Sequence, residues 1–131
     1  MEKPLPVPAG KIAECRRELA DLAKTWRRVA ARSAPLAKAE AEAQVFNQMV
    51  VGLQARFGDE RTLREPQIAL EVRLLAEGVE HGGWFPGSSL NWDVQGSVTG
   101  YRPGDRIALS EDVFTRLTEV FLDRMMRNPN V

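Results

Sequence analysis

The fold is decided by residues 11–58, which read KIAECRRELADLAKTWRRVAARSAPLAKAEAEAQVFNQMVVGLQARFG. Apolar side chains recur every three or four residues, first along 11–32 and again along 35–57, as they do on one face of an α-helix. Pro35 suits the first turn of a helix, and Gly58 is typical of a helix end. The stretch therefore predicts two helices, at about 11–32 and 35–57, that pack as an antiparallel helical hairpin.

The register of this hairpin follows from counting outward from its turn. The count places Trp26 opposite Ala43 and Leu22 opposite Phe46. A large side chain then faces a small one at the first of these levels, as an interdigitated core requires. Cys15 falls in register with the same apolar stripe, so we expect a buried and unreactive thiol.

Two further helices are predicted, at about 66–77 and 111–127. Ser110 is a good N-cap for the second of them, with two acidic residues in its first turn. Leu70 and Leu74 lie on the opposite side of the 66–77 helix from its main apolar stripe. That helix is therefore either covered on both sides or exposes an apolar strip to a partner.

Residues 81–109 differ from the rest of the chain in composition. They hold six of the ten glycines, together with two tryptophans, a phenylalanine and the tyrosine. Short β-prone runs favour a small β-hairpin inserted around 90–109. The predicted fold is thus mainly helical, with this Gly- and aromatic-rich insertion before the last helix.

Composition and length bound the organisation of the chain. Its 131 residues are 44% hydrophobic and 27% charged, which fits a single helical domain over 11–131. Three prolines in residues 1–10 predict a flexible N-terminal arm. No apolar run is long enough to span a membrane, and the N-terminus lacks the apolar region of a secretory signal. With Cys15 as the lone cysteine, we expect a cytoplasmic protein without disulfides.

The insertion is the first candidate for a binding site, because binding residues are often carried by loops on a rigid frame. Aromatic side chains interspersed with amides and charges suit stacking on a base, a sugar or a peptide. The same aromatics could instead anchor the insertion to the helices as buried residues. The candidate residues for ligand or partner binding are His81, Trp84, Phe85, Asn91, Trp92, Asp93, Tyr101 and Arg102.

No set of residues in the sequence predicts a catalytic site, a metal site or a cofactor. His81 is the only histidine, and metal ligands around it would have to be carboxylates. Ser88 and Ser89 lack the pattern around a serine nucleophile, and the glycines match no phosphate-binding or dinucleotide-binding motif. We therefore favour a protein that is not an enzyme.

Charge is unevenly distributed along the neutral chain. Residues 1–38 contain nine Lys or Arg against four acids, and the remainder contains nine against fourteen. One broad side of the first predicted helix is basic and is a candidate for phosphate binding. A solvated face that complements an acidic partner explains the same pattern. The basic residues are Arg16, Arg17, Lys24, Arg27, Arg28 and Arg32.

Four apolar residues exceed what four helices can cover, and we expect them to form an oligomer seam. They are Leu70, Leu74, Leu122 and Met126. The sequence thus favours a small non-catalytic protein–protein interaction module (an adaptor, assembly factor or inhibitor) that binds another protein or itself as a homodimer. The alternatives are a nucleic-acid-binding protein that uses the basic face, and a small-molecule enzyme or sensor that uses residues 81–105.

Overall fold

A computed structural model describes residues 7–32, 34–57, 67–86, 92 and 94–126. Four helices account for most of them: α1 (Ala9–Ala30), α2 (Pro35–Phe57), α3 (Gln67–Glu80) and α4 (Glu111–Met126). The mainly helical fold predicted from the sequence is confirmed, and none of the described residues belongs to a strand. Both α1 and α4 are amphipathic, as their three-four spacing of apolar residues requires.

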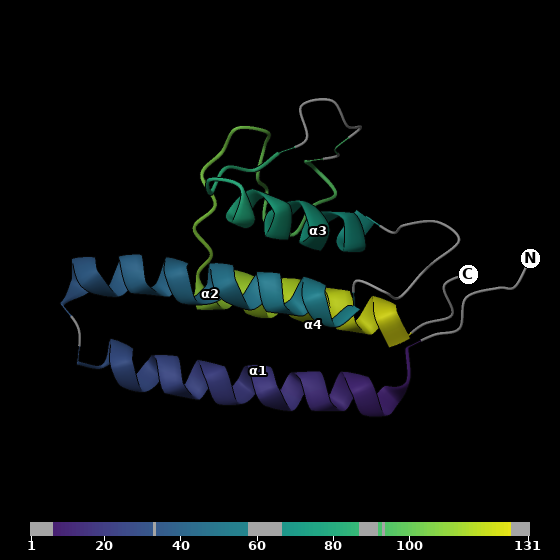
Figure 1. Ribbon diagram of the computed structural model, residues 1–131, viewed down its shortest axis with the longest axis horizontal. Coiled ribbons are helices and arrows are strands. Elements are labelled where there is room, and N and C mark those ends of the chain that lie inside the picture. Colours follow the sequence, from purple (N-terminus) through teal and green to yellow (C-terminus); the bar gives the residue numbers. More distant parts are fainter. Residues whose placement is uncertain (1–6, 33, 58–66, 87–91, 93, 127–131) are drawn as a thin grey trace, which may run out of the picture.

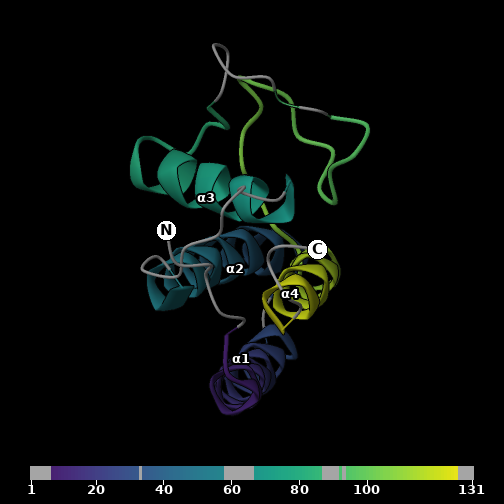
Figure 2. The same cartoon turned by 90° about the vertical axis from the view of Figure 1, so that its right-hand side faces the viewer.

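The helices are stacked in layers (Figures 1 and 2). α1 forms one outer layer, α2 and α4 lie side by side in the middle, and α3 covers them from the other side. The segment between α3 and α4 passes over the far side of α3 (Figure 2). α1 and α2 run in opposite directions, and the end where they meet projects beyond α3 (Figure 1).

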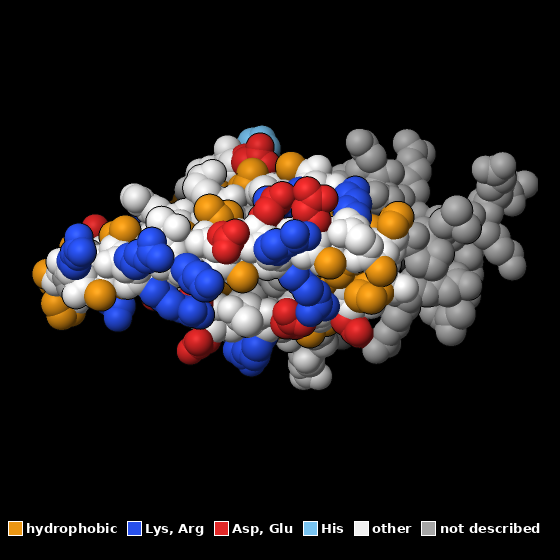
Figure 3. Space-filling model, turned by 90° about the horizontal axis from the view of Figure 1, so that it is seen from below, with side chains coloured by type: hydrophobic (Ala, Val, Ile, Leu, Met, Phe, Trp, Pro, Cys, Tyr) orange, Lys and Arg blue, Asp and Glu red, His pale blue; other side chains and the backbone are white. Residues whose placement is uncertain are grey.

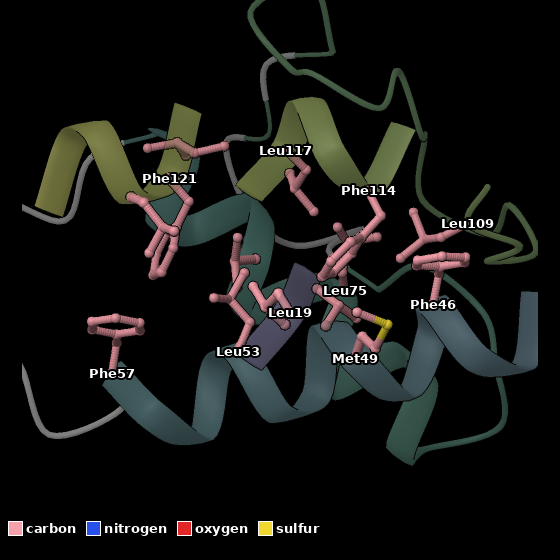
Figure 4. Close-up of a cluster of buried hydrophobic side chains, with 14 of the residues drawn as sticks. Leu19, Phe46, Met49, Leu53, Phe57, Leu75, Leu109, Phe114, Leu117 and Phe121 are labelled. Atoms are coloured by element: carbon pink, nitrogen blue, oxygen red, sulfur yellow. The ribbon is translucent and has the colours of Figure 1, made fainter. Parts of the chain in front are cut away.

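The core lies where α2 meets the other three helices (Figure 4). Its aromatic rings form contacts that join the layers: Trp26 meets Phe46 edge-on at 6.1 Å between centroids, and Phe46 lies 5.5 Å from Phe114. Phe57 and Phe121 make a second edge-on contact at 5.5 Å. Such pairs add to the free energy of burial and fix how the helices are rotated.

The α1–α2 register differs from the predicted one. Trp26 packs on Phe46, which was expected to face Leu22, and Leu22 and Val29 are about half exposed. The reason is α4, because the predicted register considered only α1 and α2. Arg16 and Arg27, on the other flank of α1, bond to α4, so α1 turns part of its apolar stripe away from α2.

α3 is covered on both sides, which answers the question that the sequence left open. Val72 and Leu75 are fully buried, and so is Leu74 on the opposite side of the helix. Gly78 allows the closest approach: a Cβ there would lie 2.4 Å from the carbonyl oxygen of Trp84 and 2.6 Å from Cδ1 of Ile107. The 81–109 segment therefore packs tightly against the end of α3.

The predicted β-hairpin around 90–109 is not found among the described residues, although residues 90, 91 and 93 lie outside them. One isolated antiparallel bridge joins Trp84 and Arg106. Helix side chains take the place of a partner strand. Asn47 of α2 donates to the carbonyl of Ile107 at 2.9 Å and accepts from the N–H of Leu109 at 3.1 Å. Since Asn47 already satisfies these backbone groups, they need no hydrogen bonds from a paired β-strand.

The start of the chain also differs in part from the predicted arm. Val7 is buried and donates its N–H to the carbonyl of Met125 at 3.0 Å, and α1 begins at Ala9. Residues 1–6 lie outside the described residues. At the other terminus, Ser110 caps α4 as predicted, with its Oγ accepting the N–H of Val113 at 3.2 Å.

Candidate functional site

An apolar groove of about 410 Å³ runs between α1 and α2. Leu19, Trp26 and Met49 are buried and line its inner part. Its α1 wall is formed by Leu22 and Val29, which are 46% and 51% exposed. Covering the exposed part of each side chain would gain at least several hundred calories per mole of burial free energy. An apolar occupant is therefore favoured there.

Apart from Arg56, the α2 wall of the groove consists of uncharged side chains. Ala41 and Gly52 have little or no side chain and make this wall shallow, and Val45 and Gln48 lie between them. A Cβ added to Gly52 would meet no atom within 4 Å, which shows that the groove is open at this point. A wall of this kind lets another backbone approach α2 closely. Arg56 lines the groove as well and is paired with Glu18 of α1.

Charge changes sign along the α1 edge of the groove. Going from the N-terminus, the exposed residues on this edge are first acidic, Glu18 and Asp21, and then basic, Arg28 and Arg32. Glu18 lies four residues before Leu22 and Arg32 lies three residues after Val29, on the same side of the helix, and Asp21 and Arg28 directly precede these two apolar residues. Figure 3, which views the molecule from below, shows basic side chains gathered toward the end where α1 meets α2.

The basic residues predicted for one face of α1 fall into two groups, those paired with α4 and those exposed to solvent. Arg16 bonds to Glu119 at 2.8 Å, and Nε of Arg27 bonds to Glu111 at 2.9 Å. The hydrogen bond to Glu111 raises the pKa of Arg27 above its ordinary value. The other four residues of the predicted face remain exposed; they are Arg17, Lys24, Arg28 and Arg32. Two of the six predicted cations thus connect α1 to α4.

The aromatic residues of the 81–109 segment pack mainly on one another. The ring of Phe85 lies 5.3 Å from that of Trp92 and 5.9 Å from that of Tyr101. Their polar atoms are also satisfied, since the indole N–H of Trp92 donates to the carbonyl of Tyr101 and the Tyr101 hydroxyl accepts the N–H of Ala108. These contacts are those of a small core that holds the segment together.

Three further candidates of this segment are exposed. Trp84 is 56% exposed. His81 directly follows α3, with Nδ1 2.8 Å from the carbonyl oxygen of Glu77, and Arg102 is exposed in a turn closed by Asp105. Asn91 and Asp93 lie outside the described residues.

The four residues of the predicted oligomer seam are also separated. Leu74 and Leu122 are buried inside the chain, and Leu70 is partly buried against the core. Met126 is exposed at the end of α4. Among the described residues, the exposed large apolar side chains are those of Leu22, Val29, Leu36, Trp84, Val120 and Met126.

Glu71 is a structural residue that the sequence analysis missed. It is 1% exposed, and its carboxylate accepts the N–H groups of Val98 and Thr99 at 2.9 Å and the Thr99 hydroxyl at 2.6 Å. The signal was its position, three residues after Ile68 and four before Leu75, on the apolar face of α3. A carboxylate placed there must be hydrogen-bonded.

Cys15 and Arg56 border a second cavity, of about 220 Å³, at the other end of the α1–α2 contact. Burial raises the pKa of the Cys15 thiol, and the nearby Arg56 guanidinium opposes this rise without cancelling it. Sγ accepts a hydrogen bond from Arg56 at 3.8 Å. Because the thiolate is the reactive form, this environment makes Cys15 a poor nucleophile.

The described residues contain neither a candidate metal site nor a candidate membrane span. No three His, Cys, Asp or Glu side chains in that part of the chain are arranged to hold a metal ion. None of the four helices combines the length and the apolar composition that a membrane span requires.

Comparison with known proteins finds no match to the chain among protein-family models, curated proteins or solved structures.

Proposed function

We propose that the protein is a small interaction module that binds another polypeptide through the groove between α1 and α2. One observation carries this proposal: Leu22 and Val29 stay about half exposed beside an open apolar groove. A polypeptide helix that places apolar side chains in this groove would cover both residues, in the manner of helix-in-groove recognition. The adaptor, assembly-factor and inhibitor roles all require such a surface.

The groove resembles a protein interface in its composition. Its centre is apolar and contains a tryptophan. Tryptophan is enriched among the residues that carry much of the binding energy at interfaces. Charged residues are found at its edge, at Asp21 and Arg28, where they select the partner's orientation. The small α2 wall around Gly52 provides room for a helix backbone.

Binding of nucleic acid through the basic face is a weaker proposal. Arg16 and Arg27 each have a carboxylate partner on α4, which reduces the positive potential of that face. Stacking of bases on Trp92 or Tyr101 would compete with the contacts these rings make within the segment. Steep loss of polyanion binding with salt would support this alternative.

A small-molecule site in residues 81–105 has less support than the groove. The cavities between α1, α2 and α4 are lined by residues outside this segment. A ligand of the segment would contact exposed candidates such as Trp84. Any such ligand would raise the melting temperature, because it binds the folded state alone.

Photo-crosslinking in the cells that make the protein tests the groove. Benzoylphenylalanine replaces Val29 in one variant and Val120 in the other; Val120 is 46% exposed on α4 and serves as the matched control. We expect a covalent adduct with a polypeptide from position 29 and none from position 120. The adduct from position 29 should disappear when Gly52→Leu fills the groove.

Gly52→Leu suits this purpose because it leaves the fold intact. A Cβ at position 52 meets no neighbouring atom, and leucine is a better helix former than glycine by roughly 0.7 kcal/mol. Gly10→Leu is its control, since Gly10 is also helical and open but lies at the start of α1. Equal adducts from positions 29 and 120, or an adduct that survives Gly52→Leu, would overturn the proposal.

A further inference from the structure

We infer that the occupant of the groove is the same surface of a second copy of this chain, related by a two-fold axis that passes between the two α1 helices at the level of Thr25. This inference rests on the proposed function and names its partner. In a two-fold interface each copy presents the same residues, so the surface must complement itself in both shape and charge. The α1 side of the groove meets both conditions.

Shape complementarity comes from the spacing of the apolar side chains. Leu22 and Val29 project half exposed from α1, and each borders the groove that the other copy would fill. They are two helical turns apart, about 10 Å at 1.5 Å per residue. Two antiparallel α1 helices can therefore each place these side chains over the partner's groove, where Ala41 and Gly52 leave room.

Charge complementarity follows from the order of charges along the same edge. The two-fold axis near Thr25 sets Asp21 of one copy opposite Arg28 of the other, and the symmetry repeats this pair. It likewise brings Arg32 toward the Glu18–Arg56 ion pair of the other copy, since Glu18 and Arg32 both lie seven residues from Thr25. A parallel arrangement would place like charges together, so the charge order selects the antiparallel one.

The α2 part of the surface does not oppose this arrangement. Its side chains along the groove, from Ala41 to Gly52, carry no charge, so no unpaired charge would be buried there. Residues 18–32 span about 21 Å of helix, which makes the interface small. We therefore expect a dimer that dissociates in the micromolar range, as small specific interfaces do.

Sedimentation equilibrium of the full chain tests this inference, over about 1 to 200 µM protein. The wild type should form a dimer over this range. Val29→Glu should leave a folded monomer, whereas Val120→Glu, an equally exposed position on α4, should dimerise like the wild type. Circular dichroism verifies that each variant is helical.

Two charge reversals give a sharper result. Asp21→Arg places two arginine–arginine pairs in the dimer, and Arg28→Asp places two aspartate–aspartate pairs there. Each variant should dimerise about 10- to 30-fold more weakly than the wild type, from two exposed pairs turned repulsive. Mixed in equal amounts, the two variants should dimerise with each other, because every pair is then attractive.

The outcomes separate this inference from the proposed function. A wild type that stays monomeric, or a mixture that fails to recover dimerisation, refutes the second copy as partner. Crosslinking from position 29 to a different polypeptide would then leave the groove as a binding site for another protein. Absence of any polypeptide adduct would refute both.

Discussion

The buried carboxylate of Glu71 gives the most precisely defined stability prediction. Glu71→Gln keeps the size and shape of the side chain and removes its charge. The carboxylate accepts three hydrogen bonds, from the N–H groups of Val98 and Thr99 and from the Thr99 hydroxyl. An amide has one oxygen and one NH₂ group, so at least one backbone N–H faces a donor in the variant.

The expected loss of stability follows from these contacts. A hydrogen bond to a charged group contributes about 1.5–3 kcal/mol, and the remaining bonds lose their charge assistance. We therefore expect Glu71→Gln to lower the free energy of unfolding by about 2–3 kcal/mol. The cost cannot be avoided by turning the side chain to solvent, because the residue is 1% exposed.

Urea unfolding followed by circular dichroism measures this loss. Glu77→Gln is the matched control: it lies on the same helix, but it is exposed and paired only with Arg73 at 3.3 Å. An exposed pair of this kind contributes less than about 0.5 kcal/mol. If Glu71→Gln were as stable as Glu77→Gln, the carboxylate would not hold the 94–101 segment and our account of that segment would be wrong.

Three further predictions concern the core and the buried thiol. Trp26→Ala should cost about 3–4 kcal/mol in urea unfolding, since it removes the ring that packs on Phe46; a loss under 1 kcal/mol would contradict this packing. Gly78→Ala should destabilise by about 1–3 kcal/mol, because the clash with the carbonyl of Trp84 outweighs the gain of about 1 kcal/mol in helix propensity. A variant more stable than the wild type would refute it. Burial raises the pKa of Cys15 above its ordinary value of 9.0. The neutral thiol's contribution to the free energy of unfolding is therefore complete below pH 9.0 and is lost as pH rises through the native pKa. Cys15→Ala should therefore show a shallower decline of stability above pH 9; identical slopes would contradict the shift.

The helices could be predicted from the sequence because their apolar periodicity is strong and their ends are marked. α2 has the predicted bounds, with Pro35 in its first turn. The sequence could not show that Leu22 and Val29 would remain half exposed. Periodicity tells which residues share a face, but how much of that face a neighbour covers depends on where α4 holds α1.

The segment between α3 and α4 was predicted less well, for a related reason. Its β-prone runs favoured a hairpin, but Glu71 and Asn47 satisfy backbone groups of this segment from the helices. Strand propensity depends strongly on such surroundings. Glu71 was visible in the sequence as a charge on an apolar face, and reading it as an anchor for a loop would have improved the prediction.

Native mass spectrometry of the protein, purified gently from its own host, tests the central claim most directly. The account predicts that the wild type and Gly10→Leu carry a second polypeptide, either another copy or another protein, and that Gly52→Leu does not. A wild type that appears as a monomer with the added mass of a small molecule or a nucleic acid would contradict it. So would a complex that persists in Gly52→Leu, because the groove would then not be the site that holds it.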